Sequence, residues 1–156
     1  MGKFSNKVVW ITGSSSGIGE ATAHEFAREG AILILTALEA DILETVAARC
    51  EELGSPKTAT LPFDLSLKDQ VGRLAEQAWN LFGHIDIFYN NAGISQRGST
   101  CETEMHVIDK IMDINWFAPV IMTKVILPKM IARGGGQLVV TTSINGRFGF
   151  PLRCAY

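Results

Sequence analysis

The sequence has little that would attract a nucleic acid. Its 156 residues hold 14 Lys and Arg against 16 Asp and Glu, for a formal net charge of −2, and no basic run occurs. Binding to a phosphate backbone relies on clustered positive charge, so we expect no nucleic-acid partner. The 47% hydrophobic content is typical of a folded domain rather than a disordered chain.

Cysteine pairs and metal-binding patterns are also lacking. Cys50, Cys101 and Cys154 lie far apart and form no CxxC pair. This pattern favours the reduced thiols of a cytoplasmic protein over disulfides. The histidines are scattered, with no carboxylate or cysteine at metal-ligand spacing, so we predict no metal site.

No segment predicts secretion or membrane insertion. The first residues lack the basic, apolar and small-residue series of a signal peptide. The longest apolar stretch, residues 114–131, is interrupted by an asparagine, two prolines and two lysines, which is unlike a membrane span. We therefore expect a soluble, cytoplasmic protein that contacts no membrane.

Apolar β-branched runs alternate with stretches of helical period along the chain. We expect strands at residues 7–11, 31–37, 58–63, 85–89 and 137–142. We expect helices at residues 17–30, 39–53, 67–82 and 102–132. Ile42, Val46 and Leu53 should face the core from the second helix, and Pro119 should kink the last one just past Asn115.

The strict alternation of strands and helices predicts an α/β fold in one domain, residues 1–156. Strands that are apolar on both faces are typical of a parallel sheet covered by helices on both sides. Right-handed crossovers then give a doubly wound sheet of order 3-2-1-4-5. This order is a nucleotide-binding first half followed by an incomplete second half.

A glycine-rich turn joins the first strand to the first helix, and its residues 12–19 read TGSSSGIG. Gly13 permits a tight turn, Gly17 lets the backbone approach a pyrophosphate, and Gly19 lets the helix pack closely on the strand. Free N–H groups at the helix start and serine hydroxyls supply donors. The predicted phosphate contacts are Gly13, Ser15, Ser16, Gly17, Ile18 and Gly19; a tight connection without a ligand is the alternative.

The spacing TGxxxGIG resembles the fingerprint of the short-chain dehydrogenase/reductase family, which has a Rossmann-type fold. The sequence NNAG at residues 90–93 is similar to the family motif that steadies the central sheet and borders the adenosine ribose. The resemblance therefore implies cofactor contacts from Asn91, Ala92 and Gly93. It also implies that Asp64, after the third predicted strand, contacts the adenine ring.

The same resemblance implies catalytic roles for Asn115, Ser143 and Tyr156. In the family, the serine bonds the reacting oxygen, and the tyrosine transfers the proton and contacts the cofactor. The implied reaction moves hydride between NAD(P)(H) and a small-molecule carbonyl or secondary alcohol. Family members also pair through a later helix, so a homodimer or homotetramer is expected at full length.

A lysine four residues after the family tyrosine lowers the phenol pKa and binds the nicotinamide ribose. The sequence ends at Tyr156, which is about three-fifths of a usual family member, so it contains no such lysine. Since an ordinary phenol has a pKa near 10, we expect the 156-residue chain alone to be inactive. A non-catalytic fragment that binds dinucleotide or a full-length partner is the alternative.

The end of the second predicted strand bears on the choice between NAD and NADP. An acid there bonds the ribose 2′-hydroxyl, whereas a basic residue accepts a 2′-phosphate. Glu39 lies twenty residues after Gly19, and Leu38 stands where NADP-using relatives often have arginine. These residues favour NAD slightly without excluding NADP; a solvated Glu39 in the first helical turn is the alternative.

Overall fold

The computed structural model describes residues 2–156, and its centre is one parallel sheet. The strands follow the order β3-β2-β1-β4-β5, which confirms the predicted doubly wound topology. Their bounds are β1 (Val8–Thr12), β2 (Ile32–Thr36), β3 (Thr58–Thr60), β4 (Ile87–Asn90) and β5 (Gln137–Val140). β5 is an edge strand, and its side chains Leu138, Val139 and Val140 are all exposed.

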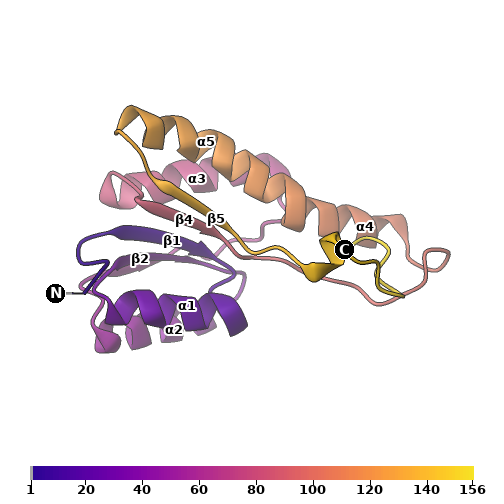
Figure 1. Cartoon of the computed structure of the whole chain (residues 1–156), viewed down its shortest axis with the longest axis horizontal. Helices are drawn as coiled ribbons and strands as arrows, with labels where there is room; N and C mark the ends of the chain where they lie inside the picture. Colours follow the sequence, from indigo (N-terminus) through magenta and orange to yellow (C-terminus); the bar gives the residue numbers. More distant parts are fainter. Residues whose placement is uncertain (1) are drawn as a thin grey trace.

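Helices cover both faces of the sheet (Figure 1). One face packs against α1 (Gly17–Arg28) and α2 (Ala40–Leu53), the other against α3 (Lys68–Phe82) and α5 (Ala118–Ala132). Trp10 of β1 and Phe88 of β4 stack in the second of these cores with ring centroids 4.3 Å apart. The Trp10 indole N–H donates to Thr36 Oγ1 at 3.0 Å, so its polar atom is satisfied in the buried layer.

The inward face of α2 differs from the predicted one. Val46 is buried as expected, but Leu43 takes the place predicted for Ile42, whose side chain is 49% exposed. Cys50 completes the buried face. Both isoleucine and leucine fit the apolar pattern, so the hydrophobic period alone did not separate the two positions.

The predicted last helix begins three residues late and contains a wide turn. α4 (Met105–Met112) continues through a π-helical turn at Asp113–Phe117 into α5. The Ala118 N–H donates to the Asp113 carbonyl five residues back, which is the π-helical bond. Pro119 follows in the first turn of α5. The predicted kink beyond Asn115 is therefore a widened turn rather than a break.

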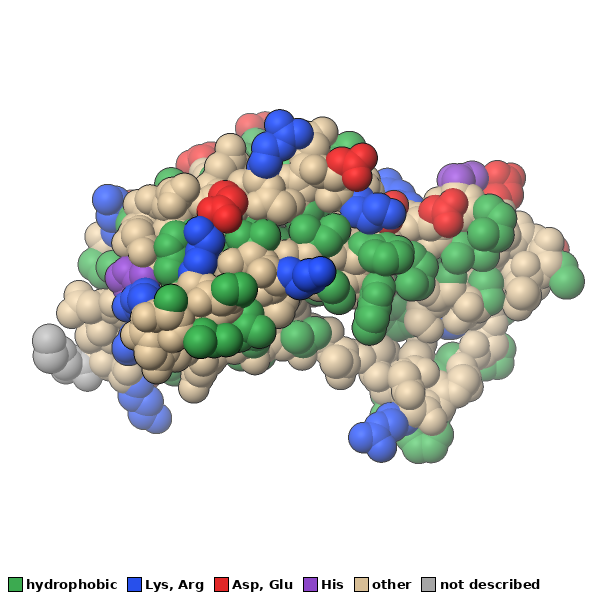
Figure 2. All heavy atoms as spheres, turned by 90° about the horizontal axis from the view of Figure 1, so that it is seen from above, with side chains coloured by type: hydrophobic (Ala, Val, Ile, Leu, Met, Phe, Trp, Pro, Cys, Tyr) green, Lys and Arg blue, Asp and Glu red, His purple; other side chains and the backbone are tan. Residues whose placement is uncertain are grey.

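This helical stretch, Met105–Ala132, is long and apolar enough to cross a membrane by length and composition, a test that core helices of soluble proteins also pass. Met122 and Ile126 bury one face of α5 in the core it shares with α3. Figure 2 shows the outer face, where hydrophobic side chains reach the surface between charged ones. The absence of a membrane contact stays a prediction.

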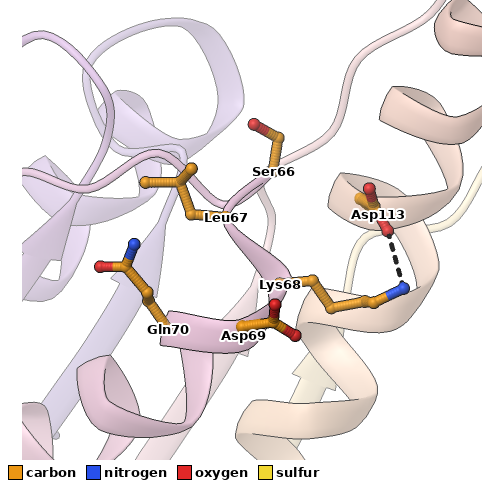
Figure 3. Close-up of a pocket in the computed structure, with 6 residues that line it drawn as sticks. All are labelled: Ser66, Leu67, Lys68, Asp69, Gln70 and Asp113. Carbon is orange, nitrogen blue, oxygen red and sulfur yellow. Dashed lines mark ion pairs between the residues drawn. The ribbon is translucent and has the colours of Figure 1, made fainter.

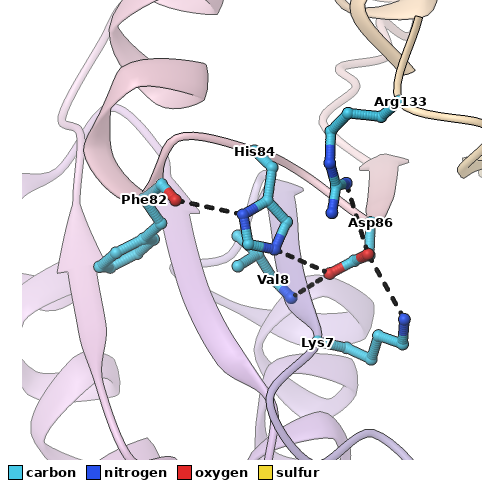
Figure 4. A network of polar contacts seen from close by, with 6 residues as sticks. All are labelled: Lys7, Val8, Phe82, His84, Asp86 and Arg133. Carbon is cyan, nitrogen blue, oxygen red and sulfur yellow. Dashed lines mark hydrogen bonds and ion pairs between the residues drawn. The ribbon is translucent and has the colours of Figure 1, made fainter. Parts of the chain in front are cut away.

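Asp86 connects three strands at the amino end of the sheet (Figure 4). Its Oδ2 accepts from the Val8 N–H at 2.9 Å, and its backbone carbonyl accepts from the Gln137 N–H at 2.8 Å. Lys7, His84 and Arg133 surround the carboxylate at 3.3–3.6 Å. Burial raises the pKa of Asp86, but the hydrogen bond and these cations outweigh it, so the net shift is downward.

We expect Asp86→Asn to destabilise the chain at neutral pH by about 1 kcal/mol, because the ion pairs are lost while one acceptor oxygen remains. A folded-state pKa below the unfolded value near 3.9 gives stability that is present above that pH. It is lost as the pH falls through the lowered pKa. Urea unfolding from pH 7 to pH 3 should thus show the gap between wild type and variant closing below about pH 4.

The exposed carboxylate Asp109 in α4 provides the matched control, since it has no ion pair within residues 2–156. Asp109→Asn should leave the unfolding free energy nearly unchanged at every pH. A gap for Asp86→Asn that stays constant down to pH 3 would contradict the role of the charge.

Candidate active site

The glycine turn lies at the carboxyl end of β1 and is held by the neighbouring strand β2. The N–H groups of Gly13 and Ser14 both donate to the Thr36 carbonyl, at 2.7 and 3.3 Å. Ser14 is fully buried and its hydroxyl donates to the same carbonyl, so its role is structural. Gly13 has φ +66°, and an added Cβ would lie 2.7 Å from the Ala92 Cα. Glycine is therefore required there by both backbone and space.

The start of α1 leaves its donors open. Ser16, at the N-cap position, is extended and its side chain makes no capping bond. Gly17 has φ +59°, and a Cβ added there would have no atom within 4 Å. The side chain of Ile18 is 62% exposed. Unpaired N–H groups beside open space are what an anion needs at a helix N-terminus.

Asn91 joins the end of β4 to the glycine turn. Its backbone N–H and that of Ala92 both donate to Thr12 Oγ1 at 3.1 Å. Its side-chain Nδ2 donates to the carbonyls of Thr12 and Gly13, at 3.1 and 3.2 Å. An added Cβ at Gly19 would lie 2.0 Å from the Gly13 oxygen, so α1 starts directly against this bonded pair.

Glu39 lies at the first turn of α2 and faces the glycine turn. The Ser15 hydroxyl donates to Glu39 Oε2 at 3.2 Å. Glu39 occupies the N-cap position of α2, but its side chain makes no capping bond. This contact holds the Glu39 carboxylate beside the predicted phosphate site. A carboxylate that bonds the adenosine ribose would have to lie there.

Asp64 forms a local turn rather than pointing freely into solvent. Its Oδ1 accepts from the Ser66 hydroxyl at 2.7 Å and from the Ser66 N–H at 2.9 Å. These two bonds, the hydroxyl first, hold the pKa of the Asp64 carboxyl below its usual value. The remaining oxygen, Oδ2, has no partner among residues 2–156. Its predicted contact with adenine stays a prediction.

Next to this turn lies a cavity of about 330 Å³ at the start of α3 (Figure 3). Lys68 and Asp113 form an ion pair of 3.5 Å at its rim, and the Lys68 ammonium lies 4.5 Å from the centre of the Phe117 ring. Its other lining residues are Ser66, Leu67, Asp69 and Gln70. None of these belongs to the glycine turn, so this cavity is separate from the predicted phosphate site.

Asn115 uses its whole side-chain amide to hold the loop after the NNAG sequence. Its Oδ1 accepts from the Ile94 N–H at 2.9 Å, and its Nδ2 donates to the Ile94 carbonyl at 2.8 Å. Gly93 lies against this clamp, 3.4 Å from Oδ1 to an added Cβ. Pro119 has no N–H to donate to the Asn115 carbonyl four residues earlier. The side-chain amide of Asn115 is thus occupied by the Ile94 backbone, and Pro119 cannot bond the Asn115 carbonyl.

Ser143 and Tyr156 lie at the carboxyl end of the sheet, beyond β5. Ser143 Oγ accepts from the Asn145 N–H at 3.2 Å and caps the short 3₁₀ turn Ile144–Gly146. A cavity of about 450 Å³ opens beside it, lined in part by Thr142 and Arg147. Tyr156 is 44% exposed. In the described part of the chain, the two hydroxyls share no hydrogen bond.

The segment just before Tyr156 is held by contacts that the sequence did not predict. The Arg153 guanidinium donates to Ser95 Oγ at 2.7 Å and to the Gln96 carbonyl at 2.6 Å. The Gly98 N–H also donates to the Leu152 carbonyl at 3.1 Å. These bonds connect the loop after NNAG to the segment before Tyr156. No spacing in the sequence marks a pairing between two irregular loops.

Comparison with known proteins agrees with this geometry. The family model described as short chain dehydrogenase matches residues 7–156. The chain is 39% identical to the bovine (Bos taurus) Dehydrogenase/reductase SDR family member 7B over 97% of its own length and 48% of that protein. The chain thus belongs to the short-chain dehydrogenase/reductase family, and it spans about half the length of this relative.

Two solved structures share the fold. L-sorbose reductase from Gluconobacter frateurii, complexed with NADPH and L-sorbose, matches with TM-score 0.92 and 33% identity, over 100% of this chain and 59% of that one. A metagenomic short-chain oxidoreductase in complex with NADP matches with TM-score 0.93 and 28% identity, over 98% and 69%. Family and neighbours support a nicotinamide dinucleotide cofactor, and the open turn at Gly17 fits one.

We expect Gly17→Val to weaken dinucleotide binding at least about tenfold, because a side chain would fill the open space in front of the helix start. The left-handed backbone adds a strain of about 1–2 kcal/mol to the fold. Titration of NADH and NADPH by fluorescence, with urea unfolding of the same samples, separates the two effects.

Gly83 at the end of α3 supplies a matched control. It has φ +73°, and a Cβ added there also meets nothing within 4 Å. Gly83→Val should lose similar stability and keep wild-type affinity. Equal affinities for all three proteins would show that the turn at Gly17 does not contact the cofactor.

Proposed function

We propose that the chain carries the cofactor-binding half and part of the catalytic site of an NAD(P)-dependent oxidoreductase. Its substrate is a small-molecule ketone or the corresponding secondary alcohol. The main support is the glycine turn, which is locked to β4 through Asn91 while its helix start faces open space. Ser143 and Asn115 reach the same end of the sheet from other elements.

In this proposal, the cofactor phosphates lie against the glycine turn and the start of α1, and the adenosine ribose lies near Ala92 and Gly93. A bound nicotinamide supplies or accepts the hydride. Ser143 donates a hydrogen bond to the substrate oxygen, and Tyr156 gives that oxygen a proton or removes one. Asn115 fixes the loop beneath the reacting groups through Ile94.

A tyrosine transfers protons efficiently near neutral pH only when its pKa is lowered. An ordinary phenol has a pKa near 10, so about one in a thousand is ionised at pH 7. A nearby cation lowers this barrier by favouring the phenolate. In the family that this chain resembles, a lysine four residues beyond the tyrosine supplies this charge.

The alternative proposal is a fragment that binds dinucleotide, or a full-length partner, without turnover. The open edge of β5 supports it, because Leu138, Val139 and Val140 are 39–55% exposed. An apolar edge strand offers unpaired backbone groups to another chain. The two proposals differ in whether extension of the chain restores chemistry.

We expect the 156-residue chain to show no ketone-dependent NAD(P)H oxidation and to self-associate. A chain extended to carry a lysine four residues after Tyr156 should oxidise the cofactor and sediment as a defined species. Tyr156→Phe in the extended chain should reduce turnover at least about 100-fold, since proton transfer is lost. Comparable turnover by the 156-residue chain, as a monomer, would contradict this proposal.

For cofactor choice, we propose that Glu39 bonds the ribose 2′-hydroxyl and favours NAD. The Ser15 contact supports this, as does the absence of Lys and Arg between residues 29 and 48. The neighbours named above contain NADP or NADPH, so the preference is a weak one. The Glu39 carboxylate would repel the 2′-phosphate of NADP. This repulsion is the reason that the proposal favours NAD.

Glu39→Ala should weaken NAD binding about fivefold to thirtyfold, as expected for the loss of a charge-assisted bond of 1–2 kcal/mol. NADP binding should stay unchanged or improve. Glu51→Ala, an exposed glutamate on the same helix, is the control for lost charge. An unchanged NAD/NADP ratio in Glu39→Ala would return Glu39 to the role of a solvated first-turn residue.

A further inference from the structure

A row of hydroxyl and amide groups crosses from β4 and β5 to the glycine turn. The Tyr89 hydroxyl lies 2.7 Å from Thr141 Oγ1, just beyond β5. Thr141 Oγ1 donates to Asn91 Oδ1 at 2.9 Å. Asn91 Nδ2 then donates to the carbonyls of Thr12 and Gly13. Nothing in the sequence motifs includes Tyr89 or Thr141.

The direction of every bond in this row is set by chemistry. Carbonyl oxygens only accept, so the amide nitrogen of Asn91 must face Thr12 and Gly13. The amide oxygen of Asn91 therefore faces Thr141, whose single O–H is used to donate to it. Thr141 has only lone pairs left, and the Tyr89 hydroxyl must donate to it. Such a chain of donors polarises each successive bond.

We propose that Tyr89 is a positioning residue for the dinucleotide. Its hydroxyl orients Thr141, which fixes the rotation of the Asn91 amide, and the amide fixes the carbonyls of the glycine turn. This inference rests on the proposed cofactor site, which it deepens. It adds a specific donor, outside the glycine and NNAG sequences, that holds the phosphate-binding turn in shape.

The hydroxyl and the ring of Tyr89 make different contacts. The ring packs against the core beneath α1 and α2, which a phenylalanine would do equally well. Only the oxygen atom makes the contact with Thr141. Tyr89→Phe therefore removes the first donor of the row and leaves the packing in place.

The row also connects the cofactor turn to the catalytic strand end. Thr141 lies two residues before Ser143, and its N–H donates to the Asn90 carbonyl at 2.9 Å. One threonine thus pairs with β4 through its backbone and reaches Asn91 through its side chain. The position of Ser143 relative to the glycine turn is fixed in part by this residue.

The test compares three single variants and one double variant by NADH and NADPH titration. Tyr89→Phe and Thr141→Val should each weaken binding about threefold to tenfold, the range of one hydrogen bond. Thr141→Ser, which keeps the hydroxyl, should restore wild-type affinity. The double variant Tyr89→Phe/Thr141→Val should bind no more weakly than Thr141→Val alone, because both changes break one row.

Thr45→Val is the control, since its hydroxyl bonds the Asp41 carbonyl on α2, away from the site. It should keep wild-type affinity. Affinities for Tyr89→Phe equal to wild type, or additive losses in the double variant, would overturn the proposal. So would a fall in melting temperature for Tyr89→Phe with no change in affinity.

A second readout does not depend on cofactor binding. The side-chain NH₂ of Asn91 should give slowly exchanging proton signals in a nitrogen-correlated NMR spectrum, and Tyr89→Phe should speed that exchange. If wild type binds no dinucleotide but the exchange changes as expected, the proposed function fails, while the orientation of the Asn91 amide by Tyr89 stands. Unchanged Asn91 signals in Tyr89→Phe would overturn the positioning role by themselves.

Discussion

The hydrogen bonds between Thr12 and Asn91 are the constraint on which the site depends. They join the carboxyl ends of β1 and β4 at the point where the chain leaves both strands, through two backbone N–H groups and one amide. Gly13 must then pass within contact of Ala92, and α1 must start against the Gly13 carbonyl. Once these ends are tied, a side chain at Gly13 or Gly19 has no space, and the start of α1 faces the open space in front of Gly17.

The two ends of the sheet are fixed by different chemistry. At the amino end, Asp86 gathers β1, β4 and β5 with a partly buried carboxylate surrounded by cations. At the carboxyl end, neutral amides and hydroxyls make the ties. The proposed binding of an anionic dinucleotide gains from this arrangement, because the groups that tie β1 to β4 carry no negative charge. Two carboxylates, Glu39 and Asp64, lie a few residues beyond the ends of β2 and β3.

Sequence period and residue type predicted the fold and the position of the glycine turn between β1 and α1, because these depend on local patterns. The alternation of apolar runs predicted the strand order. Gly13 lies in a tight turn and Gly19 packs closely on the end of β1, as predicted. The burial of Leu43 in place of Ile42 could not be predicted from the sequence, since it depends on how α2 is rotated about its axis against the sheet. The Asn115 clamp on Ile94 and the Tyr89 contact also did not follow, because they join residues 21 and 52 positions apart. Such pairings arise from tertiary packing, which no short motif records.

The hydrogen bond of Ser143 bears on whether its hydroxyl can donate to a substrate oxygen. A serine oxygen has one donor and two lone pairs. The Asn145 N–H occupies one lone pair, which leaves the O–H and the second lone pair of Ser143 without a partner among the described residues. A donor in that position suits a substrate oxygen that gains negative charge during hydride addition to a ketone. The proposed reaction also needs a proton from another group, and Tyr156 is the proposed source. Tyr156 lies at the same end of the sheet, its side chain is 44% exposed, and its hydroxyl makes no hydrogen bond within the described residues. In the proposed function, Ser143 stabilises the substrate oxygen and Tyr156 transfers the proton.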